Sequence, residues 1–75
     1  MAETLTLKNN IRTLRFFSNE MTQQELASKI GVTRQTVMAI EKGKYSPSLE
    51  VAFKIARIFN KPIDDVFQYT SLDEK

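Results

Sequence analysis

The chain has 75 residues and a formal net charge of +2, and it contains no cysteine and no histidine. These absences exclude disulfides, thiolate chemistry and cysteine-based zinc sites, and they remove the commonest general base and metal ligand. No apolar run approaches the roughly 18 residues of a membrane-spanning helix, and no secretory signal is recognisable. We therefore expect one small, soluble, intracellular domain that needs no cofactor or metal.

The first part of the chain predicts an irregular end followed by a helix. Residues 1–6 show no pattern, and we expect them to be frayed. From Leu7 to about Ser18, apolar residues recur with a helical period, and Thr6 precedes them as a possible cap. These apolar positions are Leu7, Ile11, Leu14 and either Phe16 or Phe17. Asn19 is expected to end the helix, because asparagine tolerates the left-handed conformation.

Two short amphipathic segments then meet at a single glycine. Thr22 stands three residues before a glutamate, which is the capping-box spacing, and it predicts a helix over 23–30. Gly31 ends this helix, because glycine reaches the left-handed conformation without a Cβ penalty. Thr33 caps a third helix over about 34–42. Helices joined by so tight a turn cross steeply, which makes the second one a ridge suited to the DNA major groove.

Two more helices are predicted in the second half of the chain. Gly43 ends the third helix, and Ser48 caps a fourth over about 49–59 that Asn60 ends. Its inward-facing residues are expected to be Leu49, Ala52, Ile55, Ala56 and Phe59. Pro62 begins a short fifth helix that runs to about Phe67. For Gln68–Thr70, a strand and a disordered tail both remain open, and we assign 7–69 to the domain and 70–75 to a polar tail.

One ordered set of residues carries a family resemblance. It consists of Gln23, Ala27, Gly31, Val37, Glu41 and Gly43. This order resembles the helix-turn-helix of phage repressors and Cro proteins, the xenobiotic-response-element family. The resemblance continues through SPSLEVAFKIARIFNKPIDDVF and covers roughly residues 9–69. It implies an all-α fold, a five-helix bundle of the phage-repressor type. The chain departs from the family by one extra residue between Ile11 and Thr22, which we place in the turn at 18–20.

The resemblance places the first turns of the third helix in the major groove. The candidate base-reading residues there are Thr33, Arg34, Gln35, Thr36, Met38 and Ala39. Arginine can bond guanine O6 and N7, and glutamine can bond adenine N6 and N7. Arg34 and Gln35 are therefore expected to read bases, the alternative being solvated residues at an exposed helix start. Met38 and Ala39 either meet a thymine methyl or form a tolerated apolar surface pair.

A second set of residues is expected to contact DNA phosphates. Its members are Thr22, Gln23, Lys42, Lys44, Tyr45 and Ser46. Thr22 and Gln23 begin a helix, where backbone N–H groups and the helix dipole favour anions. The resemblance further implies that Gln23 bonds a phosphate and braces Arg34. The lysines flank a turn expected to lie along the DNA backbone, with simple solubilisation as the alternative. Residues 22–48 carry four cations and two carboxylates, whereas residues 61–75 carry two cations and four carboxylates.

Two structural contacts complete the prediction. The family resemblance implies that Arg15 pairs with Glu41 and so ties the reading helix to the scaffold. The phenylalanines are expected in the core rather than in a ligand cage; they are Phe16, Phe17, Phe53, Phe59 and Phe67. An apolar edge near the last helix is expected to remain uncovered in a five-helix monomer, and its members are Ile63, Val66, Phe67 and Tyr69. We expect a two-fold dimer contact at this edge, the alternative being that it folds back on the first helix.

Three functions compete for this sequence. A homodimeric regulator, specifically a repressor, that binds double-stranded DNA fits best, with a cytoplasmic, nucleoid-associated location in a bacterium or archaeon and no evident small-molecule effector. The alternative is an antitoxin or adaptor that uses the same fold to bind a protein, which a copurifying partner would distinguish. An enzyme has no support, because the chain lacks His and Cys and shows no carboxylates clustered at a pocket spacing.

Overall fold

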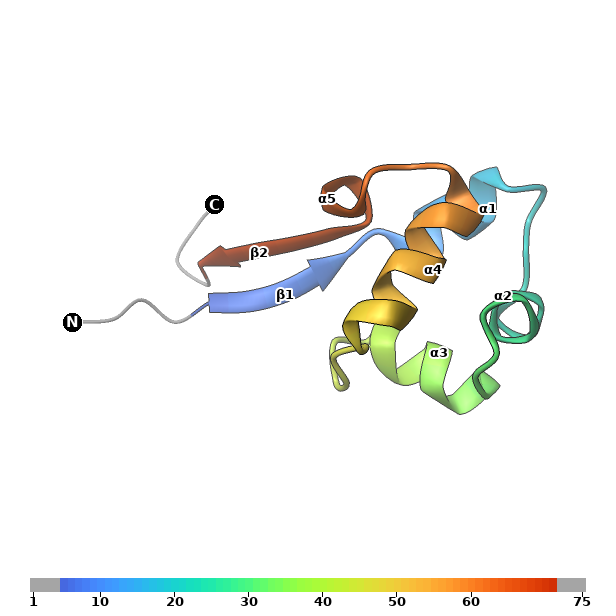
Figure 1. Ribbon diagram of the computed structural model, residues 1–75, viewed down its shortest axis with the longest axis horizontal. Coiled ribbons are helices and arrows are strands. Elements are labelled where there is room, and N and C mark those ends of the chain that lie inside the picture. Colours follow the sequence, from blue (N-terminus) through green and yellow to red (C-terminus); the bar gives the residue numbers. More distant parts are fainter. Residues whose placement is uncertain (1–4, 72–75) are drawn as a thin grey trace.

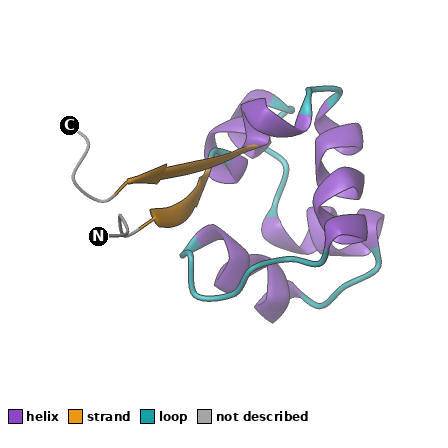
Figure 2. Cartoon of the chain, turned by 60° about the vertical axis from the view of Figure 1, so that its left-hand side comes forward, coloured by secondary structure: helices purple, strands orange, loops and turns teal. Residues whose placement is uncertain are grey.

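The structure, a computed structural model, describes residues 5–71 as five helices and one two-stranded antiparallel sheet (Figure 1). The elements in chain order are β1 (Leu5–Asn9), α1 (Ile11–Phe17), α2 (Gln23–Ile30), α3 (Arg34–Glu41), α4 (Leu49–Phe59), α5 (Ile63–Val66) and β2 (Phe67–Ser71). The two strands form a ribbon that meets the helices at one end and projects away from them (Figures 1 and 2). The all-α prediction was therefore right about the five helices and wrong in omitting the sheet.

The start of the chain is a strand where a helix was predicted. β1 pairs with β2 in a register that sets Leu5 opposite Ser71 and Asn9 opposite Phe67. Asn9 then turns the chain into α1, because its Oδ1 accepts a hydrogen bond from the Ile11 N–H at 3.1 Å. Thr6, predicted as a helix cap, instead lies opposite Thr70 in the sheet. Residues 5 and 6 are thus not frayed, while the rest of the predicted frayed end, 1–4, lies outside the described residues.

The structure decides between the two predictions for the C-terminal residues. Gln68–Thr70 lies within β2, as one of the two open predictions had it. The polar tail predicted from residue 70 is therefore shorter, because Thr70 and Ser71 are paired in the sheet. Its remaining residues, 72–75, lie outside the described part of the chain.

The predicted helix boundaries from α2 onward agree closely with the structure. Thr22 forms a complete capping box, and Thr33 and Ser48 each accept a hydrogen bond from a first-turn N–H. The predicted helix-ending residues Gly31, Gly43 and Asn60 all have positive φ, as does Asn19. Glu20 also has a positive φ, so the turn before α2, where an extra residue was expected, contains two successive left-handed residues.

The core lies between the helices and extends to the base of the ribbon. Its buried apolar members are Ile11, Leu26, Ala27, Ile30, Val37, Ile40, Ala52, Ile55, Ala56, Phe59, Val66 and Phe67. Four predicted core residues are instead exposed: Phe16, Phe17, Leu49 and Phe53. On α1 the phase is set by the buried Ile11: the inner stripe then falls on Leu14, Arg15 and Ser18, which are half-buried, and Phe16 and Phe17 lie outside it. Among residues 5–71, no helix has the length and apolar character needed to cross a membrane.

Candidate nucleic-acid interface

The candidate DNA-binding unit consists of α2, a tight turn and α3. At the turn, the N–H groups of Gly31 and Val32 both donate to the Ala27 carbonyl, at 2.9 and 3.0 Å. α3 begins only three residues after Gly31. Ala27 and Val37 are both almost fully buried, and the small side chain of Ala27 lets the two helices approach. The unit therefore presents α3 as a short outer ridge.

The exposed side of α3 carries the predicted base readers. Thr33, Arg34 and Gln35 are exposed, and the other three, Thr36, Met38 and Ala39, are half-buried. The Thr33 hydroxyl is already engaged, since it accepts from the Thr36 N–H at 3.2 Å and lies 3.0 Å from the Thr36 hydroxyl. Arg34 and Gln35 have no side-chain hydrogen bond or ion pair to another described residue. They are consequently the two long polar side chains of the ridge that are available to a ligand.

A part-buried polar network fixes the C-terminal end of α3 to the rest of the fold. Arg15 Nε lies 2.6 Å from Glu41 Oε2, and Arg15 Nη2 donates to Glu41 Oε1 at 3.0 Å, so the pair is bidentate. The side chains are only 14% and 9% exposed. Arg15 Nη1 also donates to the Met21 carbonyl at 2.9 Å. This is the pair that the family resemblance implied, and it joins α1, the turn before α2, and α3.

Gln23 belongs to the same network. Its Nε2 donates to Glu41 Oε1 at 3.1 Å, so the contact made by its side chain is with Glu41 rather than with Arg34. Because only Nε2 contacts Glu41, the side-chain amide oxygen of Gln23 remains available as an acceptor, and its backbone N–H, in the first turn of α2, remains available as a donor. The start of α2 is thereby locked to the end of α3, which sets the angle at which α3 is presented.

The predicted phosphate-contacting residues lie at the two ends of this unit. Thr22 exchanges two hydrogen bonds with Glu25, at 2.8 and 3.0 Å, which leaves the first backbone N–H groups of α2 without an acceptor in the described chain. Lys42 and Lys44 flank the turn that ends α3 and are exposed, as are Tyr45 and Ser46. The start of α2 and the end of α3, which the Gln23–Glu41 hydrogen bond holds together, thus both offer donors beside the reading ridge.

The predicted dimer edge is largely covered by the chain itself. Val66 is fully buried and Phe67 is 9% exposed, because β1 and α4 pack on them within the same chain. Asn10 fastens this region, since its backbone N–H donates to the Val66 carbonyl at 2.9 Å. Of the four predicted residues only Tyr69 is well exposed, and Ile63 is half-buried. The premise that a five-helix monomer cannot cover the edge was wrong, because it omitted β1.

Sequence reasoning passed over three exposed residues near these surfaces. Arg12 lies one turn before Arg15 on α1 and lines a surface hollow together with Gln23, Met38 and Lys42. Its spacing from Arg15 was a signal that could have found it. The exposure of Lys8 was missed because a helix was predicted where β1 lies. The exposure of Phe53 was missed because α4 was expected to bury it.

Comparison with known proteins shows which family this chain belongs to. The helix-turn-helix family matches residues 11–66, which spans α1 to α5. The chain belongs to this family, of the Cro/C1 type. The family is one of DNA-binding transcriptional regulators, and the match includes the whole α2–α3 unit.

Individual relatives share much of this chain. An uncharacterized HTH-type transcriptional regulator, MJ0272 of Methanocaldococcus jannaschii, is 54% identical over 63 residues, which cover 84% of this chain and 94% of the relative. YgzD of Bacillus subtilis, with the same type of name, is 48% identical over 61 residues and is covered to 91%. The cryptic phage CTXphi transcriptional repressor RstR of Vibrio cholerae is 39% identical over 69 residues, which span 61% of its length.

Solved structures show the same fold at lower sequence identity. A Bacteroides fragilis protein superposes with a TM-score of 0.72 at 22% identity, over 84% of this chain and all of the other. The transcriptional regulator VanUg gives a TM-score of 0.71 at 20% identity, over 95% of this chain and 92% of the other. These two likenesses concern the fold alone.

Proposed function

We propose that this chain binds double-stranded DNA in a sequence-specific manner, as a homodimer on a two-fold symmetric operator, and represses transcription. The observation that carries the proposal is the exposed start of α3, whose Arg34 and Gln35 are unengaged while the rest of the helix is fixed to the scaffold. A repressing role is supported by the relative RstR, whose name describes a transcriptional repressor.

Base reading in this proposal depends on Arg34 and Gln35. Both lie in the first turn of α3, the part of a recognition helix that contacts base edges. Arg34 would bond a guanine and Gln35 an adenine, each through two hydrogen bonds. Because the Thr33 hydroxyl caps the helix, Thr33 and Thr36 contribute shape and a possible phosphate bond. Met38 and Ala39, half-buried on the same ridge, would contact a thymine methyl.

Positioning depends on the two ends of the unit. The backbone N–H groups of Gln23 and Gln24, in the first turn of α2, would hold one phosphate next to Thr22, whose own N–H is already bonded to Glu25. Lys42 and Lys44, with the hydroxyls of Tyr45 and Ser46, would hold the DNA backbone beyond the C-terminal end of α3. Such contacts fix the register of the protein on DNA without reading its sequence.

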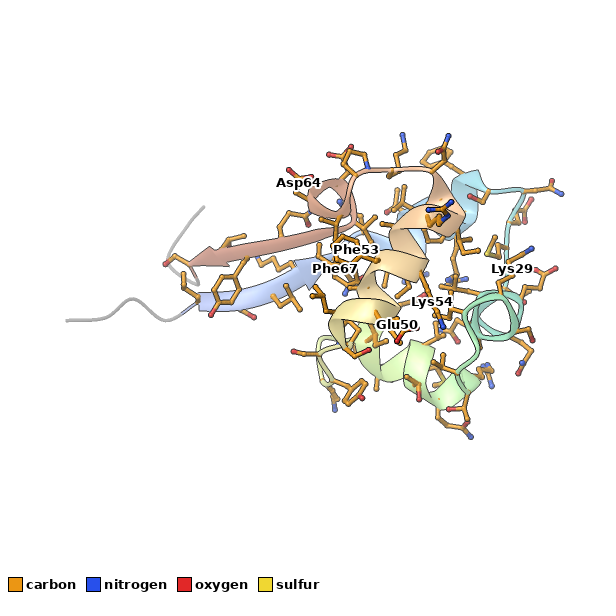
Figure 3. The ribbon with its side chains drawn as sticks, viewed as in Figure 1. Lys29, Glu50, Phe53, Lys54, Asp64 and Phe67 are labelled. Carbon is orange, nitrogen blue, oxygen red and sulfur yellow. The ribbon has the colours of Figure 1, made fainter. Side chains whose placement is uncertain are left out.

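The dimer contact must use surface that the monomer leaves open. Phe53 is 53% exposed and lines a hollow with Pro62 and Ile63 between α4 and α5. Around it α4, α5 and the turn between them carry three cations and three carboxylates, some of which are labelled in Figure 3: Lys54, Arg57, Lys61, Glu50, Asp64 and Asp65. A two-fold contact can pair such a balanced surface with its own copy. We therefore propose that Phe53 and Ile63 are at the centre of the contact, with Tyr69 as a further contact.

The experiment that tests the DNA-binding proposal is selection of bound duplexes from a random pool with the purified protein, followed by a salt titration. We expect a motif with a dyad and half-sites about 10–10.5 base pairs apart, centre to centre. A motif without a dyad would refute the two-fold arrangement. Equal affinity for selected and random duplexes at moderate salt would refute sequence-specific binding.

The dimer is tested separately by sedimentation at tens of micromolar. Phe53→Glu should give a monomer with an unchanged helical spectrum, because Phe53 lies outside the core. Phe17→Glu is the matched control: Phe17 is 77% exposed on α1, so this variant should still dimerise. A monomeric unmutated protein, or a dimeric Phe53→Glu variant, would count against this surface.

A further inference from the structure

A basic groove lies beside the helix-turn-helix and extends onto α1 and β1. It consists of two surface hollows that share Glu41 and Lys42. The first is lined by Arg12, Arg15, Gln23, Met38, Glu41 and Lys42. The second is lined by Thr6, Leu7, Lys8, Asn9, Glu41, Lys42 and Gly43. Each hollow is wide enough to admit a phosphate group and is open to solvent, so the groove is a surface track rather than an enclosed pocket.

The groove has an unbalanced positive charge. Its single carboxylate, Glu41, is already bonded to Arg15 and Gln23. This leaves Lys8, Arg12 and Lys42, all exposed and none ion-paired with another described residue. Glu20 lines a neighbouring hollow together with Arg12 and Arg15, but it is ion-paired with neither among the described residues. Three unpaired cations along one track create a potential that attracts a polyanion.

The position of the groove identifies that polyanion. Met38, from α3, and Gln23, from the start of α2, line the same hollow as Arg12. The end of β1 is attached directly to α3, because Asn9 Nδ2 donates to the Ile40 carbonyl at 3.0 Å. A duplex held by α3 therefore has its backbone next to Lys8 and Arg12. Continuity with Lys42, itself a proposed phosphate contact, favours the same DNA over a separate small anion.

We infer that Lys8 and Arg12 bind phosphates of the DNA flanking the reading helix, so that the N-terminal strand and first helix form part of the DNA-binding surface. This inference depends on the proposed function. It also assigns a role to the β1 end of the ribbon, which holds Lys8 alongside the end of α3. Neither residue is expected to read bases, because a lone cation on a phosphate carries no sequence information.

The test is the salt dependence of operator binding by Arg12→Gln and Lys8→Gln. Each variant should lower the slope of log affinity against log salt by about 0.9. Across a change from 50 to 200 mM salt, that corresponds to a difference of about three- to four-fold in affinity relative to the unmutated protein. The preferred bases should not change. In ethylation interference, each variant should lose the signal of the phosphate that its own side chain contacts, whereas Lys44→Gln, used for comparison, should retain that signal.

Two controls separate this effect from general charge loss. Lys29→Gln removes one positive charge from an exposed residue of α2, at the opposite end of the molecule from the ribbon (Figure 3), and should leave the slope nearly unchanged. Arg12→Lys keeps the charge and should keep the slope. Circular dichroism checks that each variant retains its helices, as expected for exposed side chains.

Several outcomes would overturn the inference. Unchanged slopes in both glutamine variants, with intact operator binding by the unmutated protein, would refute it while leaving the proposed function standing. A changed base preference in Arg12→Gln would make Arg12 a reader and refute its phosphate role. Competition by inorganic phosphate at millimolar concentration, without a slope change, would assign the groove to a free anion. If the unmutated protein prefers no duplex, the proposed function and this inference fail together.

Discussion

The α2–α3 unit and the ribbon represent two different ways in which this sequence determines structure. The α2–α3 unit is determined by signals a few residues apart: Thr22 with Glu25, Gly31 with Ala27, and Thr33 with the N–H of Thr36. The ribbon instead joins the two ends of the described chain, with Leu5 opposite Ser71. Local signals can be read in sequence order, whereas a strand is defined by a partner that the local pattern does not reveal. The structure accordingly matched the prediction at α2–α3 and corrected it at β1.

The largest expected effect tests whether the ribbon end belongs to the core. Phe67→Ala should cost about 3–5 kcal/mol of unfolding free energy, because it removes a buried aromatic side chain. Phe17→Ala, at a position once expected to be buried, should change it by less than about 0.5 kcal/mol. Urea unfolding of the two variants measures the difference. Similar costs for both would mean that the ribbon end contributes no more to the core than an exposed position on α1.

A somewhat smaller effect tests how α3 is attached. Glu41→Ala leaves the part-buried Arg15 without its partner and should cost up to about 3 kcal/mol, the low end for a broken buried pair. The matched control is Glu50→Ala, which breaks the exposed 3.6 Å pair with Lys54 and should cost about 0–1 kcal/mol. Thermal or urea unfolding measures both. Equal costs would show that the Arg15–Glu41 network does not hold the reading helix.

The smallest of the stability effects concerns a local cap. Thr33→Ala removes the acceptor for the Thr36 N–H and should cost about 1 kcal/mol. Thr13→Ala, on the exposed side of α1, should be neutral or slightly stabilising, because alanine is the better helix former. If Thr33→Ala lowers the free energy of unfolding and Thr13→Ala does not, the result supports local capping signals as the basis of the α2–α3 unit. A neutral Thr33→Ala would contradict it.

The limits of sequence reasoning follow from particular residues. The spacing of Leu7 and Ile11 fits a helix, but Thr6, Leu7 and Lys8 also alternate as a strand does, and only the pairing with β2 decides between them. The exposure of Phe53 and Leu49 could not be predicted from an apolar stripe on α4 that is wider than the core it covers. The Arg15–Glu41 pair was available only through resemblance, because no local pattern connects residues 26 positions apart.

The exposure of the start of α3 was better predicted than the strands. Arg34 and Gln35 follow the Thr33 cap directly, so their exposure at the start of α3 could be inferred from the sequence alone. Lys8 could not be placed there, because its position depends on β1, whereas the spacing of Arg12 from Arg15 on α1 was a usable signal. For the same reason the sequence did not reveal that Val66 and Phe67, two members of the predicted dimer edge, are covered within the chain.

Base reading by the start of α3 is the central claim, and the most direct measurement is parallel selection from a random duplex pool with the unmutated protein, Arg34→Ala and Lys44→Ala. Arg34→Ala should lose about 1–3 kcal/mol of binding free energy and relax the preference at one base position in each half-site. Lys44→Ala should keep the motif, weaken all duplexes alike and lower the salt slope by about one. An unchanged motif in Arg34→Ala would contradict the account.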